Sequence, residues 1–149
     1  NQINTIGTDH VANQLKLKID GDSVWDALAG FPGVGTLLPI LLSEGVNKNK
    51  ISLNQLVELT SYNASKIFGM TSKGKIDAGY DADITIIDMK KEQKADSFLF
   101  DGFSDYLVYD GWVLKGWPVK TIVRGEIISE DFEIVGKRGF GRLVPRTLS

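Results

Sequence analysis

Two neighbouring side chains near the start of the sequence could carry out acid–base or metal chemistry. Asp9 and His10 lie in the stretch GTDHVAN, residues 7–13, and His10 is the only histidine among 149 residues. A carboxylate and an imidazole can each bind a divalent metal ion or transfer a proton. An isolated aspartate after a strand is nevertheless more often a turn or helix-cap residue, so this pair alone does not define a site.

A glycine-rich segment, GFPGVGT at residues 30–36, is a second candidate. Glycines allow backbone N–H groups to converge on a phosphate at the start of a helix. No lysine follows the last glycine, so the charge that would neutralise terminal phosphates is missing. The segment therefore indicates either a tight entry into a helix or a contact with a different kind of ligand.

Composition limits the possible functions. A hydrophobic content of 42% with 24% charged residues is typical of a folded globular protein. The net charge of −2 argues against a nucleic-acid partner, because binding phosphates requires a basic face. The sequence has neither an apolar run of about 18 residues nor a secretory signal pattern, which predicts a cytoplasmic protein without membrane contact. The absence of cysteine excludes disulfides and thiolate metal ligands.

The candidate residues need structural elements to position them. Residues 3–8 are short and partly apolar and are predicted to form a strand, which would place Asp9 at its carboxyl end. Residues 15–22 alternate Leu and Ile with Lys, which favours an extended loop or an edge strand. The apolar run at 34–44 predicts a buried helix that contains Pro39 near its start or at a kink and closes at Gly45.

Later segments carry clearer local signals. Ser52 and Gln55 have the spacing of a capping box, which predicts a helix over 52–60. A second, short helix is predicted to start at Asn63.

Beyond Gly74 the pattern changes from helical to β. The predicted strands cover residues 84–87, 119–123, 127–128 and 132–135, with a hairpin turn at Arg124-Gly125. The chain is thus predicted to divide near residue 72 into an α/β half and a mostly β half.

Five motifs occur in an order that is similar to a known family. They are GTDH, AGFPGVGTLLPILLSEGV, SLNQLVELTSYNASKIFGM, KGKIDAGYDADITIID and GWPVKTIVRGEII. This succession resembles the end of the cyclic amidohydrolases, the group of dihydroorotase, hydantoinase and allantoinase, and the resemblance covers nearly the whole chain. Pro32-Gly33 before an apolar helix is most similar to dihydroorotases.

The resemblance implies an α/β fold that is part of a larger protein. Residues 1–72 would form the last strand and helices of a (β/α)₈ TIM-type barrel, and residues 73–149 the C-terminal part of a small β-sandwich. The expected partner is the missing N-terminal part of the same protein or a second copy in a homo-oligomer.

The resemblance also implies a set of site residues. In this family, two divalent metal ions, usually zinc, are held by histidines and a carboxylated lysine from earlier barrel strands. Asp9 matches the aspartate that completes the site, as a metal ligand and as the catalytic group that shuttles a proton. Asn13 occupies the position at which dihydroorotases often have a substrate-binding histidine, and the backbone at Pro32 and Gly33 would face the substrate ring. His10 is expected to be a neighbour rather than a ligand.

The expected activity is that of a dihydroorotase, which closes N-carbamoyl-aspartate reversibly to dihydroorotate in pyrimidine synthesis. The substrate would be a small cyclic amide or ureido acid. A catalytic zinc needs about three protein ligands, so this chain by itself is predicted to bind no metal and to be inactive. The alternatives are a hydantoinase or allantoinase, or a non-catalytic scaffold protein with the same fold.

Overall fold

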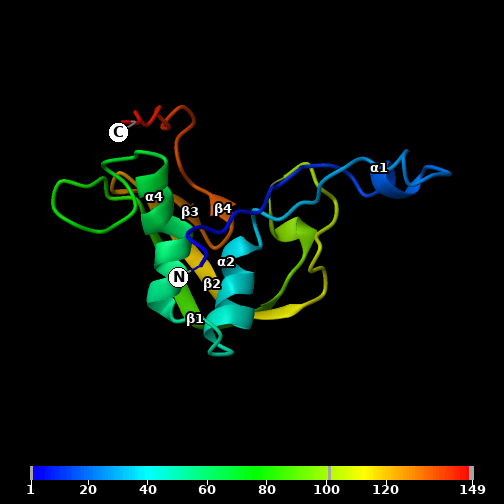
Figure 1. Cartoon of the computed structure of the whole chain (residues 1–149), viewed down its shortest axis with the longest axis horizontal. Coiled ribbons are helices and arrows are strands. Elements are labelled where there is room, and N and C mark those ends of the chain that lie inside the picture. The colour runs from blue at the N-terminus through cyan, green and yellow to red at the C-terminus, as the bar shows by residue number, and fades with distance from the viewer. Residues whose placement is uncertain (1, 101, 148–149) are drawn as a thin grey trace.

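A layer of helical segments packs on a four-stranded antiparallel sheet, and an arm that carries α1 projects away from both layers (Figure 1). The computed structural model describes residues 2–100 and 102–147. Within these residues, no helix is long and apolar enough to cross a membrane. The helical segments are α1 (Lys16–Ile19), α2 (Leu37–Ile40), η1 (Leu41–Val46), α3 (Leu53–Val57), η2 (Glu58–Tyr62), α4 (Asn63–Ile67) and η3 (Ser97–Leu99). The strands are β1 (Ile84–Lys94), β2 (Val113–Val123), β3 (Glu126–Glu130) and β4 (Glu133–Ile134), paired in the order β1-β2-β3-β4.

The helix predicted over residues 34–44 is present with shifted ends. It begins at Leu37 with α2 and continues through η1 to Val46, so Gly45 lies inside it and does not close it. The Gly45 carbonyl instead accepts the Lys50 N–H at 2.9 Å, which begins the following turn. Pro39 lies in the first turn, where a missing N–H costs no helical hydrogen bond.

The capping box is confirmed, whereas the prediction of a second helix start is wrong. The Gln55 N–H donates to Ser52 Oγ at 3.1 Å, and the Ser52 N–H donates to Gln55 Oε1 at 2.8 Å. The helix then continues without a break through α3, η2 and α4. Asn63 is helical, and its side-chain amide donates to the Asn4 carbonyl at 3.0 Å instead of capping a new helix.

Two predictions for the first 22 residues differ from the structure. Residues 3–8 form no strand. Among the described residues, they lie beside η2, and the Ile6 N–H donates to the Leu59 carbonyl of that helix. A segment without a neighbouring strand has no ladder partner. Residues 15–22 contain the one-turn helix α1, which local hydrogen bonds such as Asp20 N–H to the Lys16 carbonyl close.

The predicted hairpin is confirmed. Arg124 and Gly125 form the two-residue connection between β2 and β3, and their φ angles are 47° and 84°. Positive φ at both positions matches the tight turn that follows the right-handed twist of the flanking strands.

The core lies between the helical layer and β2. Trp117 and Leu114 of β2 are fully buried, and Phe132 packs edge-to-face on Trp117 with ring centroids 5.6 Å apart. Leu42 covers Gly116 so closely that a Cβ at Gly116 would lie 2.9 Å from the Leu42 Cβ. The glycine therefore allows the helix to approach the strand.

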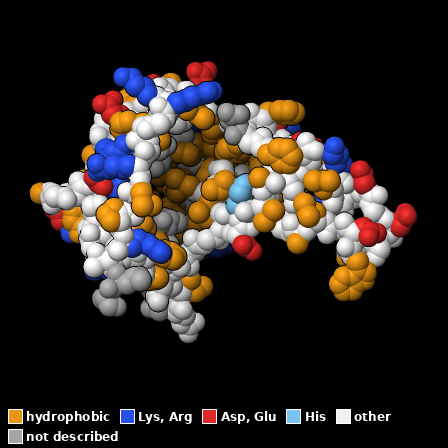
Figure 2. All heavy atoms as spheres, turned by 90° about the horizontal axis from the view of Figure 1, so that it is seen from above, with side chains coloured by type: hydrophobic (Ala, Val, Ile, Leu, Met, Phe, Trp, Pro, Cys, Tyr) orange, Lys and Arg blue, Asp and Glu red, His pale blue; other side chains and the backbone are white. Residues whose placement is uncertain are grey.

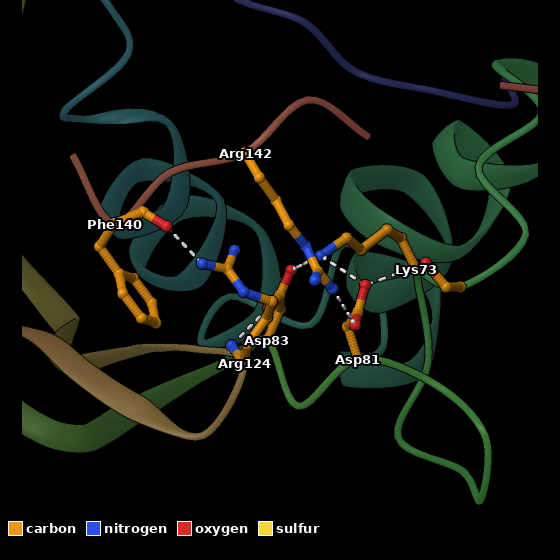
Figure 3. A network of polar contacts seen from close by, with 7 residues as sticks. Lys73, Asp81, Asp83, Arg124, Phe140 and Arg142 are labelled. Atoms are coloured by element: carbon orange, nitrogen blue, oxygen red, sulfur yellow. Dashed lines mark hydrogen bonds and ion pairs between the residues drawn. The ribbon is translucent and has the colours of Figure 1, made fainter. Parts of the chain in front are cut away.

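A network of charged side chains joins the chain before β1 to the C-terminal segment (Figure 3). Lys73 pairs with Asp83 and lies 3.0 Å from Asp81 Oδ2. Arg142 lies 3.2 Å from the other oxygen of Asp81, and the Arg124 N–H donates to Asp83 Oδ1 at 2.8 Å. Each carboxylate therefore has a charged partner and a further hydrogen bond, which favours its ionised form.

This network predicts a specific dependence of stability on pH. Burial alone raises the pKa of Asp83, but the hydrogen bonds from Lys73 and the Arg124 N–H outweigh burial and hold that pKa below its ordinary value. The hydrogen bond from Lys73 likewise lowers the pKa of Asp81. For carboxyl groups with a lowered folded pKa, the stabilisation is present above the unfolded pKa and disappears as the pH falls through the folded value.

We expect the Lys73→Met variant to be less stable than the wild type at pH 7 and to lose less stability on acidification, because without the ammonium group the folded pKa values of both carboxyl groups lie closer to their unfolded values. The urea midpoint measured between about pH 2 and pH 7 checks this. Lys75→Met is the control, since Lys75 and Asp77 form an exposed pair and such pairs contribute little. Identical acid profiles for Lys73→Met and Lys75→Met would contradict the prediction.

Candidate functional site

Two segments that are distant in the sequence meet beside Asp9. His10 and Phe31 form a parallel bridge, and the Val11 N–H donates to the Phe31 carbonyl at 3.0 Å. Gly33 also lies close to Thr8, because a Cβ at Gly33 would lie 3.4 Å from the Thr8 Cβ. Residues 8–11 and residues 31–34 thus contact each other, and this contact region is called the joint below.

Asp9 lies between Thr8 and His10, the two residues that contact the glycine-rich segment. The residue is exposed, and its φ of 46° places the backbone in the left-handed region. A residue other than glycine pays a conformational cost in that region, and such strained residues cluster at functional sites. Among the described residues, no side-chain hydrogen bond or ion pair occupies this carboxylate. It is therefore available to a ligand.

His10 holds the glycine-rich segment. Its Nδ1 accepts hydrogen bonds from the Gly33 N–H at 3.0 Å and the Val34 N–H at 3.3 Å. A nitrogen that accepts carries no proton, so the neutral ring carries its proton on Nε2. Sequence reasoning treated His10 only as a neighbour of Asp9, because no local pattern connects it with residues 23 positions later.

Pro32 and Gly33 lie in the middle of the joint. Pro32 is buried, and the Gly33 carbonyl accepts from the Thr36 N–H and from Thr36 Oγ1. Both polar backbone groups of Gly33 are thus engaged by the protein. Proline has no N–H, so the remaining polar backbone group of this pair is the carbonyl of the buried Pro32.

Asn13 is buried and makes two hydrogen bonds within the protein. Its Oδ1 accepts from the Tyr106 hydroxyl at 2.8 Å, and its Nδ2 donates to the Ala29 carbonyl at 3.3 Å. Burial raises the pKa of Tyr106, which keeps the hydroxyl as a donor. No local pattern in the sequence indicates this partner, because the contact between Asn13 and Tyr106 spans 93 residues.

Cavities flank the joint. One of about 300 Å³ is lined by Thr8, Pro32 and Gly33 together with Tyr109, and a second of about 260 Å³ is lined by His10, Gly33 and Ser104, among others. The connection between β1 and β2 therefore contributes walls to both cavities, with Tyr109 in the first and Ser104 in the second. Figure 2 shows one face of the molecule with a hollow whose surface consists mainly of hydrophobic side chains.

The described residues do not assemble a complete metal centre. They contain no group of three or more His, Cys, Asp or Glu side chains that could hold a metal ion. The exposed oxygen atoms of Asp9 suit a divalent cation, and this carboxylate could serve as one ligand of a site whose other ligands come from elsewhere.

Named relatives cover nearly all of this chain. The L-hydantoinase of Paenarthrobacter aurescens is 38% identical over 146 residues, which are 97% of this chain and 32% of the relative. The dihydroorotase of Methanothermobacter thermautotrophicus is 38% identical over 144 residues, with the same coverage of 97% and 32%. The chain spans about a third of the length of these relatives.

Solved structures give the same result. The L-hydantoinase (dihydropyrimidinase) from Arthrobacter aurescens superimposes with a TM-score of 0.91 at 38% identity, covering 97% of this chain and 32% of that one. A crystal structure of a D-hydantoinase superimposes with a TM-score of 0.92 at 34% identity, covering 98% and 32%.

The family assignment rests on most of the sequence. Residues 2–128 match the amidohydrolase family, whose members generally depend on a metal ion. This match confirms the resemblance carried by the five ordered motifs, and relatives named dihydroorotase and hydantoinase both occur among the similar proteins. The chain belongs to the amidohydrolase family.

Proposed function

We propose that this chain is the C-terminal part of a longer, metal-dependent cyclic amidohydrolase, and that the whole enzyme is a dihydroorotase. One observation carries this proposal: the Asp9 carboxylate is exposed on a left-handed backbone, beside the joint with Pro32 and Gly33. The dihydroorotase relative and the similarity of Pro32-Gly33 to dihydroorotases support the choice of substrate.

The fold assignment belongs to the same proposal. Residues 1–72 would supply the last strand and helices of a (β/α)₈ barrel, and residues 73–149 would supply part of a β-sandwich. Residues 3–8 form no strand in this chain, and in the longer protein a neighbouring barrel strand would supply the ladder partner that they lack. Asp9 would then follow the last strand, where barrel enzymes collect their chemistry. The hydrophobic hollow in Figure 2 would be covered by the remainder of the polypeptide.

Asp9 would bind one of two divalent metal ions, with zinc as the expected metal. When bound, the metal ions would polarise the ring carbonyl and make the attacking water more acidic. Asp9 would take the proton of that water while the new C–O bond forms. As the ring C–N bond breaks, the same carboxyl group would deliver the proton to the leaving nitrogen. Ring closure is the reverse of these steps.

Pro32, Gly33 and Asn13 would contact the substrate. The Pro32 carbonyl would accept a hydrogen bond from a ring N–H, and the Gly33 backbone would pack against the ring. Asn13 would donate an Nδ2–H to the substrate carboxylate, exchanging its hydrogen bond to the Ala29 carbonyl when substrate enters, while its Oδ1 stays bonded to the Tyr106 hydroxyl. An amide supplies no positive charge, so it would hold a carboxylate less strongly than a charged histidine.

Hydantoinase activity is the second candidate. The similar solved structures are of hydantoinases or dihydropyrimidinases, and the L-hydantoinase of Paenarthrobacter aurescens is as similar to the chain as the dihydroorotase is. The neutral Asn13 favours a ring without a carboxylate, which is a physical reason for keeping this candidate.

Assays of the full-length protein separate these functions. The protein is loaded with zinc and offered dihydroorotate, hydantoin and allantoin, and ring opening is followed by the loss of ultraviolet absorbance or by chromatography. Hydrolysis of dihydroorotate supports the proposal, whereas activity only on hydantoin or allantoin selects the second candidate. A protein that binds no metal and opens none of the rings would be a scaffold, and the proposal would be rejected.

A further inference from the structure

We propose that His10 is a positioning residue that locks the substrate-facing segment 32–34 to the segment carrying Asp9. The inference rests on the proposed function and adds a residue to its machinery. Its basis is the pair of hydrogen bonds by which Nδ1 accepts the N–H groups of Gly33 and Val34.

The imidazole contributes something that the neighbouring backbone pairing does not. The bridge between His10 and Phe31 ends before the glycine-rich turn, and the Val11 N–H bonds to Phe31 rather than to residues beyond it. From Gly33 onward, the side chain of His10 replaces the missing ladder partner. Both backbone groups of Gly33 are thereby held: His10 accepts from its N–H, and Thr36 donates to its carbonyl.

The lock fixes a distance that catalysis requires. Asp9 precedes His10 directly, so anchoring residues 33–34 to the His10 ring sets where the Pro32 carbonyl lies relative to the Asp9 carboxylate. A loop that holds the substrate without carrying the chemistry should change KM more than kcat.

Replacements of His10 separate the acceptor atom from the shape of the ring. Asn places its Oδ1 close to the position of Nδ1, whereas Gln extends its acceptor further, and Leu fills space without an acceptor. We expect His10→Leu and His10→Gln to raise KM about tenfold with kcat reduced less than about threefold. We expect His10→Asn to stay within about threefold of the wild type in both constants.

Hydrogen exchange provides a readout that does not need activity. In the full-length protein, the amides of Gly33 and Val34 should exchange about fivefold faster in His10→Leu than in the wild type, because each loses its acceptor. His10→Asn should restore slow exchange. The control is Ser23→Ala, which removes the acceptor of the Trp25 N–H at the tip of the arm and should leave the amides of residues 33 and 34 unchanged.

The outcomes distinguish this inference from the proposed function. If the wild type opens none of the three rings, the proposed function fails, while amide exchange still decides whether His10 holds the turn. Equal exchange in wild type and His10→Leu would overturn the lock. A His10→Asn variant as impaired in KM as His10→Leu would also overturn it, because the acceptor would then be irrelevant.

Discussion

Replacing Asp9 by alanine in the full-length, zinc-loaded protein is expected to lower kcat by a factor of about 10² to 10⁴, because the variant has no group to move the proton of the attacking water. Asp9→Asn should be similarly impaired, since an amide keeps the size of the side chain but cannot accept that proton. Steady-state kinetics with the ring that the wild type hydrolyses, together with metal analysis, measures both losses.

Asp22→Asn is the matched control. Asp22 is an exposed aspartate on the arm, away from the joint between residues 8–11 and 31–34. The kcat of the Asp22→Asn variant should therefore equal that of the wild type. If Asp9→Ala keeps kcat within about threefold of the wild type, Asp9 cannot be the proton shuttle. If Asp9→Ala loses bound metal but the fraction that still holds metal turns over at the wild-type rate, the role of Asp9 would be limited to metal binding.

Replacing Trp117 by alanine is expected to lower the free energy of unfolding by about 3–5 kcal/mol. Trp117 is fully buried, packs edge-to-face on Phe132, and donates its Nε1–H to the Leu114 carbonyl at 2.9 Å. The variant loses this contact area and leaves a buried carbonyl without its donor. Urea denaturation followed by circular dichroism gives the change.

Trp25→Ala provides the comparison, because it removes the same side chain from an exposed position. Trp25 lies on the arm and is 90% exposed, so its replacement should change the free energy of unfolding by less than about 0.5 kcal/mol. Comparable destabilisation by Trp117→Ala and Trp25→Ala would show that the core does not lie where this fold places it.

Local signals identified most of the regular elements. The capping box at Ser52 and Gln55 and the turn at Arg124-Gly125 were predictable because the atoms involved lie within a few residues of one another. The strand predicted at 3–8 failed because a strand requires a partner, and a sequence pattern does not supply one. For the same reason, the alternating residues 15–22 indicated an extended segment where the chain forms one helical turn.

Residue types and the order of motifs were enough to assign the family and to single out Asp9 as the candidate carboxylate, because both can be read along the chain. The folded structure was needed to find that His10 holds Gly33, that Asn13 pairs with Tyr106, and that Trp117 is buried while Trp25 is exposed. The physical reason is that each of these facts depends on which distant segments meet. The hydrophobic effect brings distant segments together, but it is non-directional, so the local spacing of apolar residues does not show which segment each will pack against.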